Sequence, residues 1–226
     1  MASHPFDLIG FDDMLTQEQR DVMRTTRAML DKEVRPHLMD WYERGEVPAR
    51  DLALRFGQLG LLGMHLEGYG CAGMDATTYG LACLELEAAD SGIRSLVSVQ
   101  GSLAMFAIHR FGSEEQRQQW LPRMATGEVL GCFGLSEPDA GSDPAAMSTT
   151  AVRRDGGWVL NGSKMWITNG HVADIAVVWA RTYDGVRGFI VPTDAAGFTA
   201  IPVHHKMSLR ASITSELVLR DVHVGD

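Results

Sequence analysis

The feature that most constrains the fold of this chain is a change in hydrophobic periodicity near residue 130. Before this point, side chains suited to burial recur three or four positions apart, as in the series Val22, Thr26, Met29, Leu30, Val34, Leu38 and Trp41. This spacing places them on one face of an α-helix. After residue 130, short runs rich in β-branched residues alternate with turns at intervals of about 8–12 residues, as in small barrels and sandwiches. We therefore predict an α+β, multidomain chain: an N-terminal all-α helical domain over residues 1–129, then an antiparallel β-barrel domain over residues 130–226.

Local signals place the elements within these two regions. Thr16–Gln19 and Ser113–Gln116 are capping boxes, in which a hydroxyl N-cap is followed three residues later by an amide, and each predicts the start of a helix. We expect a helical stretch that begins at the Thr16 cap and continues to about Trp41, and helices over 49–59, 75–90, 95–110 and 114–126. We expect strands over 131–135, 148–153, 157–160, 164–168, 175–180, 187–191, 198–203 and 216–224, with a turn at Asp155-Gly156.

Composition excludes several functional classes. The 226 residues include 20 basic and 29 acidic side chains, and a net charge of −9 disfavours binding to nucleic acid. The three cysteines are scattered without metal-type spacing, which favours reduced thiols and predicts no metal site. The N-terminus lacks a signal-peptide pattern, and no apolar run approaches the ~18 residues of a membrane span. These features predict a cytoplasmic protein without a membrane span.

One short motif suggests a nucleotide site and is rejected. Gly68–Gly73 matches G-x-G-x-x-G, but the dinucleotide fingerprint requires a preceding strand and a helix that begins on the glycines. Here the motif lies inside the helical region, so a flexible loop between two helices is the better interpretation.

Two other stretches have the residue types of a cofactor site. In Gly131–Asp143 a strand breaks into a loop rich in proline and glycine, which would offer backbone N–H groups and a hydroxyl to a flat heterocycle and its phosphates. An ordinary β-turn explains this stretch equally well. In Asn161–Gly170 a strand carries Trp166 and Thr168, a stacking surface beside a hydroxyl, although a tryptophan is more often a core residue.

Taken together, F-G-L-S-E-P-D-A-G-S-D and N-G-S-K-M-W-I-T-N resemble the acyl-CoA dehydrogenase family, and the resemblance covers nearly the whole chain. It implies tightly bound FAD, oxidation of the Cα–Cβ bond of an acyl thioester in fatty-acid or amino-acid catabolism, transfer of electrons to an electron-transfer flavoprotein, and assembly as a homotetramer. The resemblance also assigns the cofactor contacts to Phe133, Gly134, Leu135, Ser136, Gly141, Ser142, Trp166, Ile167 and Thr168. In this assignment the Thr168 hydroxyl lies near flavin N5.

The segment Asp90–Gln100 resembles the glutaryl-CoA dehydrogenase branch of the family. The resemblance assigns Glu87, Arg94, Ser95, Ser98 and Ser142 to the substrate. A planar guanidinium can hold a terminal carboxylate through two hydrogen bonds, whereas an apolar acyl tail would leave it unpaired. The alternative is a surface pair of Arg94 with Asp90 or Glu87.

Some features depart from that branch or from the family. Gly101 stands where the branch more often has serine, and Asp139-Ala140 in the cofactor loop also differs. In the family, a third, C-terminal helical domain carries the glutamate base, and this sequence stops at Asp226, where that domain is expected to begin. Neither Glu137 nor Glu216 matches the base, so we assign no catalytic residue.

We therefore expect the isolated chain to be nearly inactive and to bind FAD weakly. Three other functions remain open: a dehydrogenase for unfunctionalised short or branched acyl-CoA, a non-catalytic acyl-CoA- or flavin-binding fragment, and an oxidase.

Overall fold

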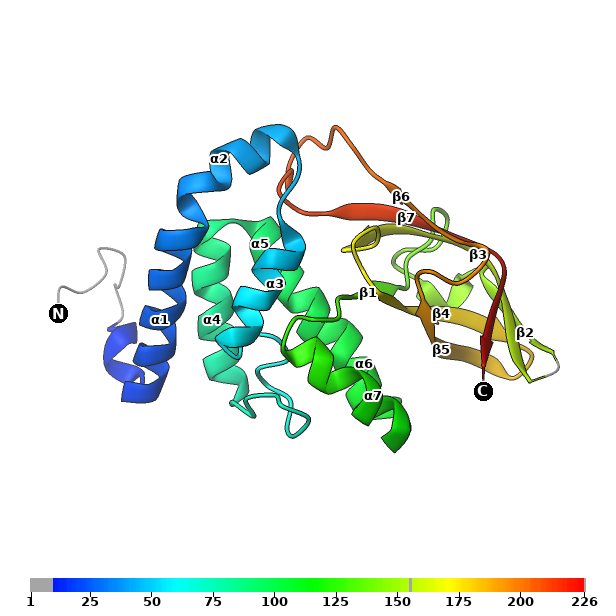
Figure 1. Ribbon diagram of the computed structural model, residues 1–226, viewed down its shortest axis with the longest axis horizontal. Coiled ribbons are helices and arrows are strands. Elements are labelled where there is room, and N and C mark those ends of the chain that lie inside the picture. Colours follow the sequence, from blue (N-terminus) through cyan, green and yellow to red (C-terminus); the bar gives the residue numbers. More distant parts are fainter. Residues whose placement is uncertain (1–9, 155, 226) are drawn as a thin grey trace.

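A computed structural model of the chain describes residues 10–154 and 156–225, with helices first and strands afterwards (Figure 1). The N-terminal segment discussed above and Asp155 of the expected turn lie outside the described residues. The helices are α1 (Gln17–Glu33), α2 (Arg35–Arg44), α3 (Ala49–Gln58), α4 (Ala76–Ala89), α5 (Ser91–Ser98), the π-helix η2 (Val99–Met105), α6 (Phe106–Phe111) and α7 (Glu114–Ala125), with the short 3₁₀ helices η1 (Phe11–Met14) and η3 (Pro144–Ala146). The strands are β1 (Gly131–Gly134), β2 (Thr150–Arg154), β3 (Gly157–Thr168), β4 (Ile175–Thr182), β5 (Gly185–Pro192), β6 (Phe198–Pro202) and β7 (Thr214–Gly225).

Both capping boxes are confirmed as helix starts. The Thr16 and Ser113 hydroxyls each accept a hydrogen bond from the backbone N–H of the glutamine three residues later. The helical stretch predicted from Thr16 to about Trp41 is not continuous, since α1 ends at Glu33 and α2 begins at Arg35. Pro36 lies in the first turn of α2, where its missing N–H costs nothing, but it could not continue α1 without losing a helical hydrogen bond. The helix predicted over 95–110 begins earlier, at Ser91, and includes the π-helix η2.

The helical part and the sheet share one core. Leu30, Phe56 and Leu86 are fully buried among the helices, and Ile175 and Val177 of β4 belong to the same apolar cluster. In Figure 1, β1 leads out of the helical part and enters the sheet beside β4. A second cluster, which includes Leu160 and Leu217, fills the concave side of the β part. The outer face of β4 is therefore fixed against the helices.

The sheet is mixed, so the prediction of an antiparallel barrel is wrong. Its strand order is β1-β4-β2-β3-β7-β6, with β5 also paired to β4. β1 runs parallel to β4, and a further parallel bridge joins β2 to β4, while the remaining pairs are antiparallel. Parallel neighbours require a long crossover, and here the chain between β1 and β4 contains the predicted cofactor loop and the β2–β3 hairpin. The sheet therefore curls into a half-barrel and leaves β1 at an edge.

The fold also agrees with the rejection of the dinucleotide motif. Gly68–Gly73 lies in the loop between α3 and α4, as the rejection of the dinucleotide motif requires. Within residues 10–154 and 156–225, no helix has the length and apolar character needed to cross a bilayer.

Candidate functional site

The first predicted cofactor stretch lies on an open edge of the sheet. Phe133 and Gly134 belong to the edge strand β1, and Leu135 and Ser136 continue beyond its end. An edge strand exposes backbone donors and acceptors that no neighbouring strand uses. Further along, Gly141 is exposed, and a Cβ added there would meet nothing within 4 Å. The strand and its loop thus form a surface that a ligand could reach.

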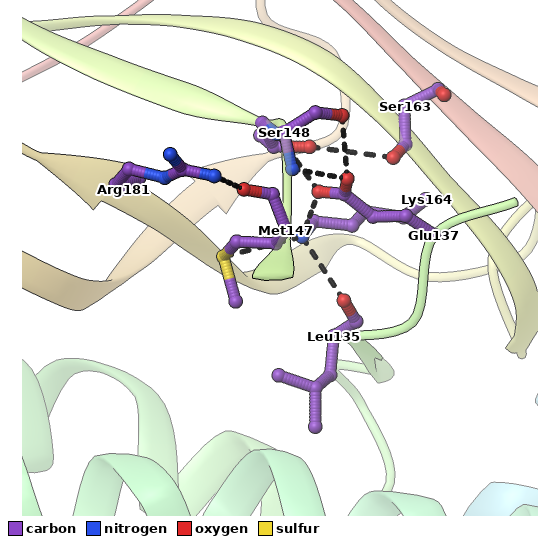
Figure 2. A network of polar contacts seen from close by, with 8 residues as sticks. Leu135, Glu137, Met147, Ser148, Ser163, Lys164 and Arg181 are labelled. Carbon is purple, nitrogen blue, oxygen red and sulfur yellow. Dashed lines mark hydrogen bonds and ion pairs between the residues drawn. The ribbon is translucent and has the colours of Figure 1, made fainter. Parts of the chain in front are cut away.

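A buried ion pair holds this loop in place (Figure 2). Lys164 of β3 has no exposed side-chain surface, and its ammonium donates to Glu137 Oε1 at 2.8 Å and to the Leu135 carbonyl at 3.0 Å. Glu137 lies in the loop itself, and its side chain is 3% exposed. Lys164 therefore contacts the predicted cofactor loop at two points, and sequence reasoning did not identify it.

Glu137 also organises the segment that follows the loop. Its Oε2 accepts bonds from the Ser148 N–H at 2.6 Å and the Ser148 hydroxyl at 2.7 Å, and Oε1 accepts from the Thr149 N–H at 2.9 Å. Figure 2 shows Ser148 and Lys164 meeting at the one Glu137 carboxylate. A carboxylate that accepts this many bonds is a structural anchor rather than a free base.

The protonation of the pair follows from its contacts. Burial alone would raise the pKa of Glu137, but hydrogen bonds from Lys164, Thr149 and Ser148 outweigh it and lower the pKa to about 2. Burial lowers the pKa of Lys164, and Glu137 only partly offsets this. The two groups differ because the carboxylate has several N–H and O–H donors, whereas the ammonium has, besides Glu137, only a carbonyl and the Met147 sulfur. Glu137 is therefore a very weak base whose two oxygens are already occupied by donors, which makes it unsuited to abstract a proton.

The second predicted stretch lies beside the first. The Met165 N–H donates to the Ser136 carbonyl at 2.9 Å, which joins the two stretches directly. The pairing of β3 with β7 shifts between Lys164 and Ile167. Within this irregularity Trp166 adopts a φ of 65° and its side chain is 63% exposed. A bulky residue with positive φ is strained, and such strain is concentrated at functional sites.

The three predicted residues of this stretch have different environments. Trp166 is exposed, Thr168 is half-buried and Ile167 is buried in the core of the β part. The edge strand, the exposed indole and the nearby hydroxyl together fit a flat aromatic cofactor. Ile167 could contact such a group only through its backbone. Asn169, which sequence reasoning did not select, is buried, and its side-chain amide has no hydrogen-bond partner in the described structure.

Four of the five predicted substrate residues lie together on α4 and α5, whereas Ser142 lies apart from them, exposed in the loop after β1. Arg94 Nε donates to Glu87 Oε2 at 2.7 Å, and Arg94 Nη1 donates to the Ser98 hydroxyl at 3.2 Å. The hydrogen bond from Arg94 is the largest cause of a lowered pKa at Glu87, followed by a bond from Ser91. Ser95 contributes its carbonyl, which accepts from Ser98 Oγ at 3.4 Å.

The surface pairing considered for Arg94 is thus partly observed. The partner is Glu87, while Asp90 instead caps α5 by accepting from the Gly92 N–H at 2.7 Å. The Arg94 side chain remains 37% exposed, and its Nη2 group has no hydrogen-bond partner in the described structure. Arg94 can therefore bind an anion without losing Glu87.

A polar row extends this cluster along α4 and was missed at the sequence level. Tyr79, Cys83 and Glu87 are four residues apart and so share one face of α4. The Tyr79 hydroxyl lies 2.6 Å from Ser102 Oγ. Burial raises the pKa of Tyr79 to about 12. The sequence signal for this row was the i, i+4, i+8 spacing of polar side chains within the predicted helix.

Two further features of the sequence concern metal binding and the departure at Gly101. Within the described ranges, no group of three or more His, Cys, Asp or Glu residues is arranged to hold a metal ion. Gly101, the departure from the branch pattern, packs so closely that a Cβ there would lie 2.7 Å from the Gly63 nitrogen. A serine at Gly101 would therefore require a shift of the backbone at Gly63.

Comparison with known proteins identifies the family. The acyl-CoA dehydrogenase N-terminal domain matches residues 16–128, and the acyl-CoA dehydrogenase middle domain matches residues 132–222. A crystal structure of glutaryl-CoA dehydrogenase from Mycobacterium smegmatis is 65% identical, with a TM-score of 0.96, over 97% of this chain and 57% of that one. A second from the same organism, in complex with FADH2, is 58% identical with a TM-score of 0.96, over 98% of this chain and 57% of that one.

A curated relative, the short-chain specific acyl-CoA dehydrogenase of Clostridium acetobutylicum, is 37% identical over 93% of this chain and 57% of its own length. The chain thus spans little more than half the length of the relatives it matches. With both domains matched in order and the whole fold shared, the chain belongs to the acyl-CoA dehydrogenase family.

Proposed function

We propose that this chain supplies the flavin-binding and acyl-recognition parts of an FAD-dependent dehydrogenase that oxidises the Cα–Cβ bond of glutaryl-CoA, with decarboxylation. One observation carries the proposal. The Arg94 cluster (Glu87, Arg94, Ser95 and Ser98) and the cofactor edge (Phe133–Ser136 with Trp166 and Thr168) occur in one structure, and one apolar core continues between them. When bound, FAD would supply the hydride acceptor.

The cofactor edge supports the flavin assignment. The backbone of Phe133–Ser136 would line the ring, Trp166 would stack against it, and Thr168 would donate a hydrogen bond. Gly141 and Ser142 would lie at the phosphates, where a loop with open space suits a charged group. Glu137 and Lys164 hold these parts in register without touching the ligand.

The Arg94 cluster supports a carboxylated acyl group. Glu87 holds Nε and so orients the guanidinium. Nη2 is unpaired in the described structure, and a carboxylate that takes the place of the Ser98 hydroxyl at Nη1 would meet the Nη1–Nη2 edge. Two parallel bonds from this edge are a strong and selective arrangement. The similarity to two glutaryl-CoA dehydrogenase structures agrees with this choice.

The test compares glutaryl-CoA with butyryl-CoA. Their affinities are measured by calorimetry on the FAD-saturated chain, and turnover is measured on a chimera that appends the part of the M. smegmatis enzyme that this chain does not cover. We expect glutaryl-CoA to be preferred, and Arg94→Ala to weaken its binding about 10- to 100-fold by removing a charge-assisted pair while leaving butyryl-CoA within about two-fold.

Equal losses for both thioesters would contradict the assignment of Arg94 to the carboxylate. Arg24→Ala is a matched control, because Arg24 forms an exposed pair with Asp21 on α1, outside the site. This control should leave both affinities unchanged.

A dehydrogenase for unfunctionalised short acyl-CoA is the alternative. It is favoured by the existing Glu87–Arg94 pair, which neutralises the arginine without a ligand, and by the similarity to a short-chain specific enzyme. In that case butyryl-CoA would be preferred, and Arg94→Ala would have little effect on either substrate.

The remaining parts of the proposal concern the whole protein. We infer that electrons pass to an electron-transfer flavoprotein, that the active assembly is a homotetramer in the cytoplasm, and that the proton-abstracting glutamate is not among these residues. The low pKa and the full pairing of Glu137 support the last point. Substantial turnover by the 226-residue chain alone would overturn it.

A further inference from the structure

A buried glutamine lies where the helical part meets the sheet. Gln100 belongs to the π-helix η2, two residues after Ser98, and its side chain is fully buried. Its Nε2 donates to the Met124 carbonyl at 3.1 Å and to the Val129 carbonyl at 2.8 Å. Its Oε1 accepts from the Gly131 N–H at 2.7 Å. One side chain thus binds the end of α7, the connecting segment and the first residue of β1.

These contacts require the carboxamide of glutamine. Two carbonyls need donors and one N–H needs an acceptor, and a primary amide supplies both. A hydrocarbon would leave the Val129 carbonyl and the Gly131 N–H unpaired and would leave the Met124 carbonyl with only its local backbone donors. An ionised carboxylate would face two carbonyls without a proton to donate. Asparagine is one methylene shorter and could not reach all three backbone groups.

The surrounding backbone is packed too closely to move independently. A Cβ at Gly131 would lie 2.8 Å from the Ala104 Cβ and from the Met124 Cε. Gly101, beside Gln100, approaches the Gly63 backbone equally closely. The π-helix itself is a rare form that is found most often at functional sites.

The positions of the two ligand-binding regions depend on this junction. Ser98 precedes Gln100 by two residues, and Phe133 follows Gly131 by two residues. The glutamine is therefore a short, rigid connection between the helix that carries Arg94 and the strand that would line the flavin. We propose that Gln100 is a positioning residue that fixes the distance from Arg94 to the cofactor edge and thereby sets the acyl length that the site accepts. This inference rests on the proposed function.

The test measures selectivity for length as well as stability. The dissociation constants of glutaryl-CoA and of adipyl-CoA, which is one methylene longer, are determined on the FAD-saturated chain for the unmodified sequence, Gln100→Leu and Gln100→Glu. The matched control is Thr78→Val, which removes a part-buried hydrogen bond from the buried Thr78 to Asp75, wholly within the helical part. Thermal unfolding is recorded for each variant.

We expect the unmodified chain to prefer glutaryl-CoA by about 10-fold, the usual discrimination for one methylene. Gln100→Leu should reduce this ratio to within about two-fold of unity, whereas Thr78→Val should keep it while losing stability. In Gln100→Glu the ratio should depend on pH. It should be preserved in acid, where the protonated carboxyl can donate to one carbonyl, and lost as the pH rises and the group ionises.

The outcomes separate the two proposals. A chain that binds glutaryl-CoA no better than butyryl-CoA contradicts the proposed function itself. A chain that prefers glutaryl-CoA but keeps its ratio over adipyl-CoA in both Gln100 variants overturns the role of Gln100. If Gln100→Leu does not fold, the role of Gln100 is judged from Gln100→Glu alone. Its preference for glutaryl-CoA over adipyl-CoA should then change with pH, whereas that of Thr78→Val should not, because valine has no ionisable group.

Discussion

Two ion pairs of nearly equal length occupy the two ends of the proposed site. Lys164–Glu137 spans 2.8 Å and its side chains are 0% and 3% exposed, whereas Arg94–Glu87 spans 2.7 Å with side chains 37% and 45% exposed. The buried pair is enclosed by further hydrogen bonds and has no open donor edge, so it holds the proposed cofactor loop in place. The exposed pair keeps part of its guanidinium open. Burial, rather than the pair itself, separates a structural from a binding role.

The largest effect that follows from this comparison is the loss of Lys164. In Lys164→Met the Glu137 carboxylate stays buried without its cation, and such a change typically costs about 3–5 kcal/mol of unfolding free energy. Chemical denaturation, followed by circular dichroism, measures it. In the double variant Glu137→Leu/Lys164→Met no charge is left unpaired, so part of the stability should return. A loss below about 1 kcal/mol in Lys164→Met would show that the pair behaves like a surface pair.

Acid should release the same interaction more gradually. The pKa of Glu137 is lowered to about 2 from an ordinary value of 4.5, so its ionised form stabilises the folded chain. The contribution is complete above about pH 4.5 and is lost as the pH falls through 2, with a total of roughly 3 kcal/mol. The difference in stability between the unmodified chain and Glu137→Gln should shrink over this range. A constant difference would contradict the lowered pKa.

The comparison also shows how far sequence reasoning reached. The periodicity change near residue 130 located the switch from helices to strands, and the hydroxyl caps at Thr16 and Ser113 marked helix starts correctly. These are local signals, since a cap or a periodic face depends on residues a few positions apart. The Arg94–Glu87 pair was likewise anticipated as one of two surface pairings, because its members lie seven residues apart.

Features that depend on distant contacts could not be predicted. The parallel pairing of β1 with β4 joins residues more than 40 positions apart, and strands in both parallel and antiparallel sheets share the same alternation. Lys164 gave no sign of burial, because lysine is almost always exposed unless it is paired, and its partner lies 27 positions away. The threefold anchoring by Gln100 is invisible for the same reason.

The smallest expected effect on stability comes from Glu87→Gln, the same substitution at the exposed pair. The carboxamide oxygen of the new side chain can still accept from Arg94 Nε, and exposed pairs contribute about 0.2–1 kcal/mol, so the unfolding free energy should change by no more than about 0.5 kcal/mol. Removing the negative charge should nevertheless strengthen the attraction of Arg94 for a ligand carboxylate. Calorimetry should then show glutaryl-CoA binding a few-fold tighter, with butyryl-CoA unchanged. If Glu87→Gln destabilised the chain as much as Glu137→Gln, exposure would not distinguish the two pairs, and the binding role of Arg94 would lose its physical basis.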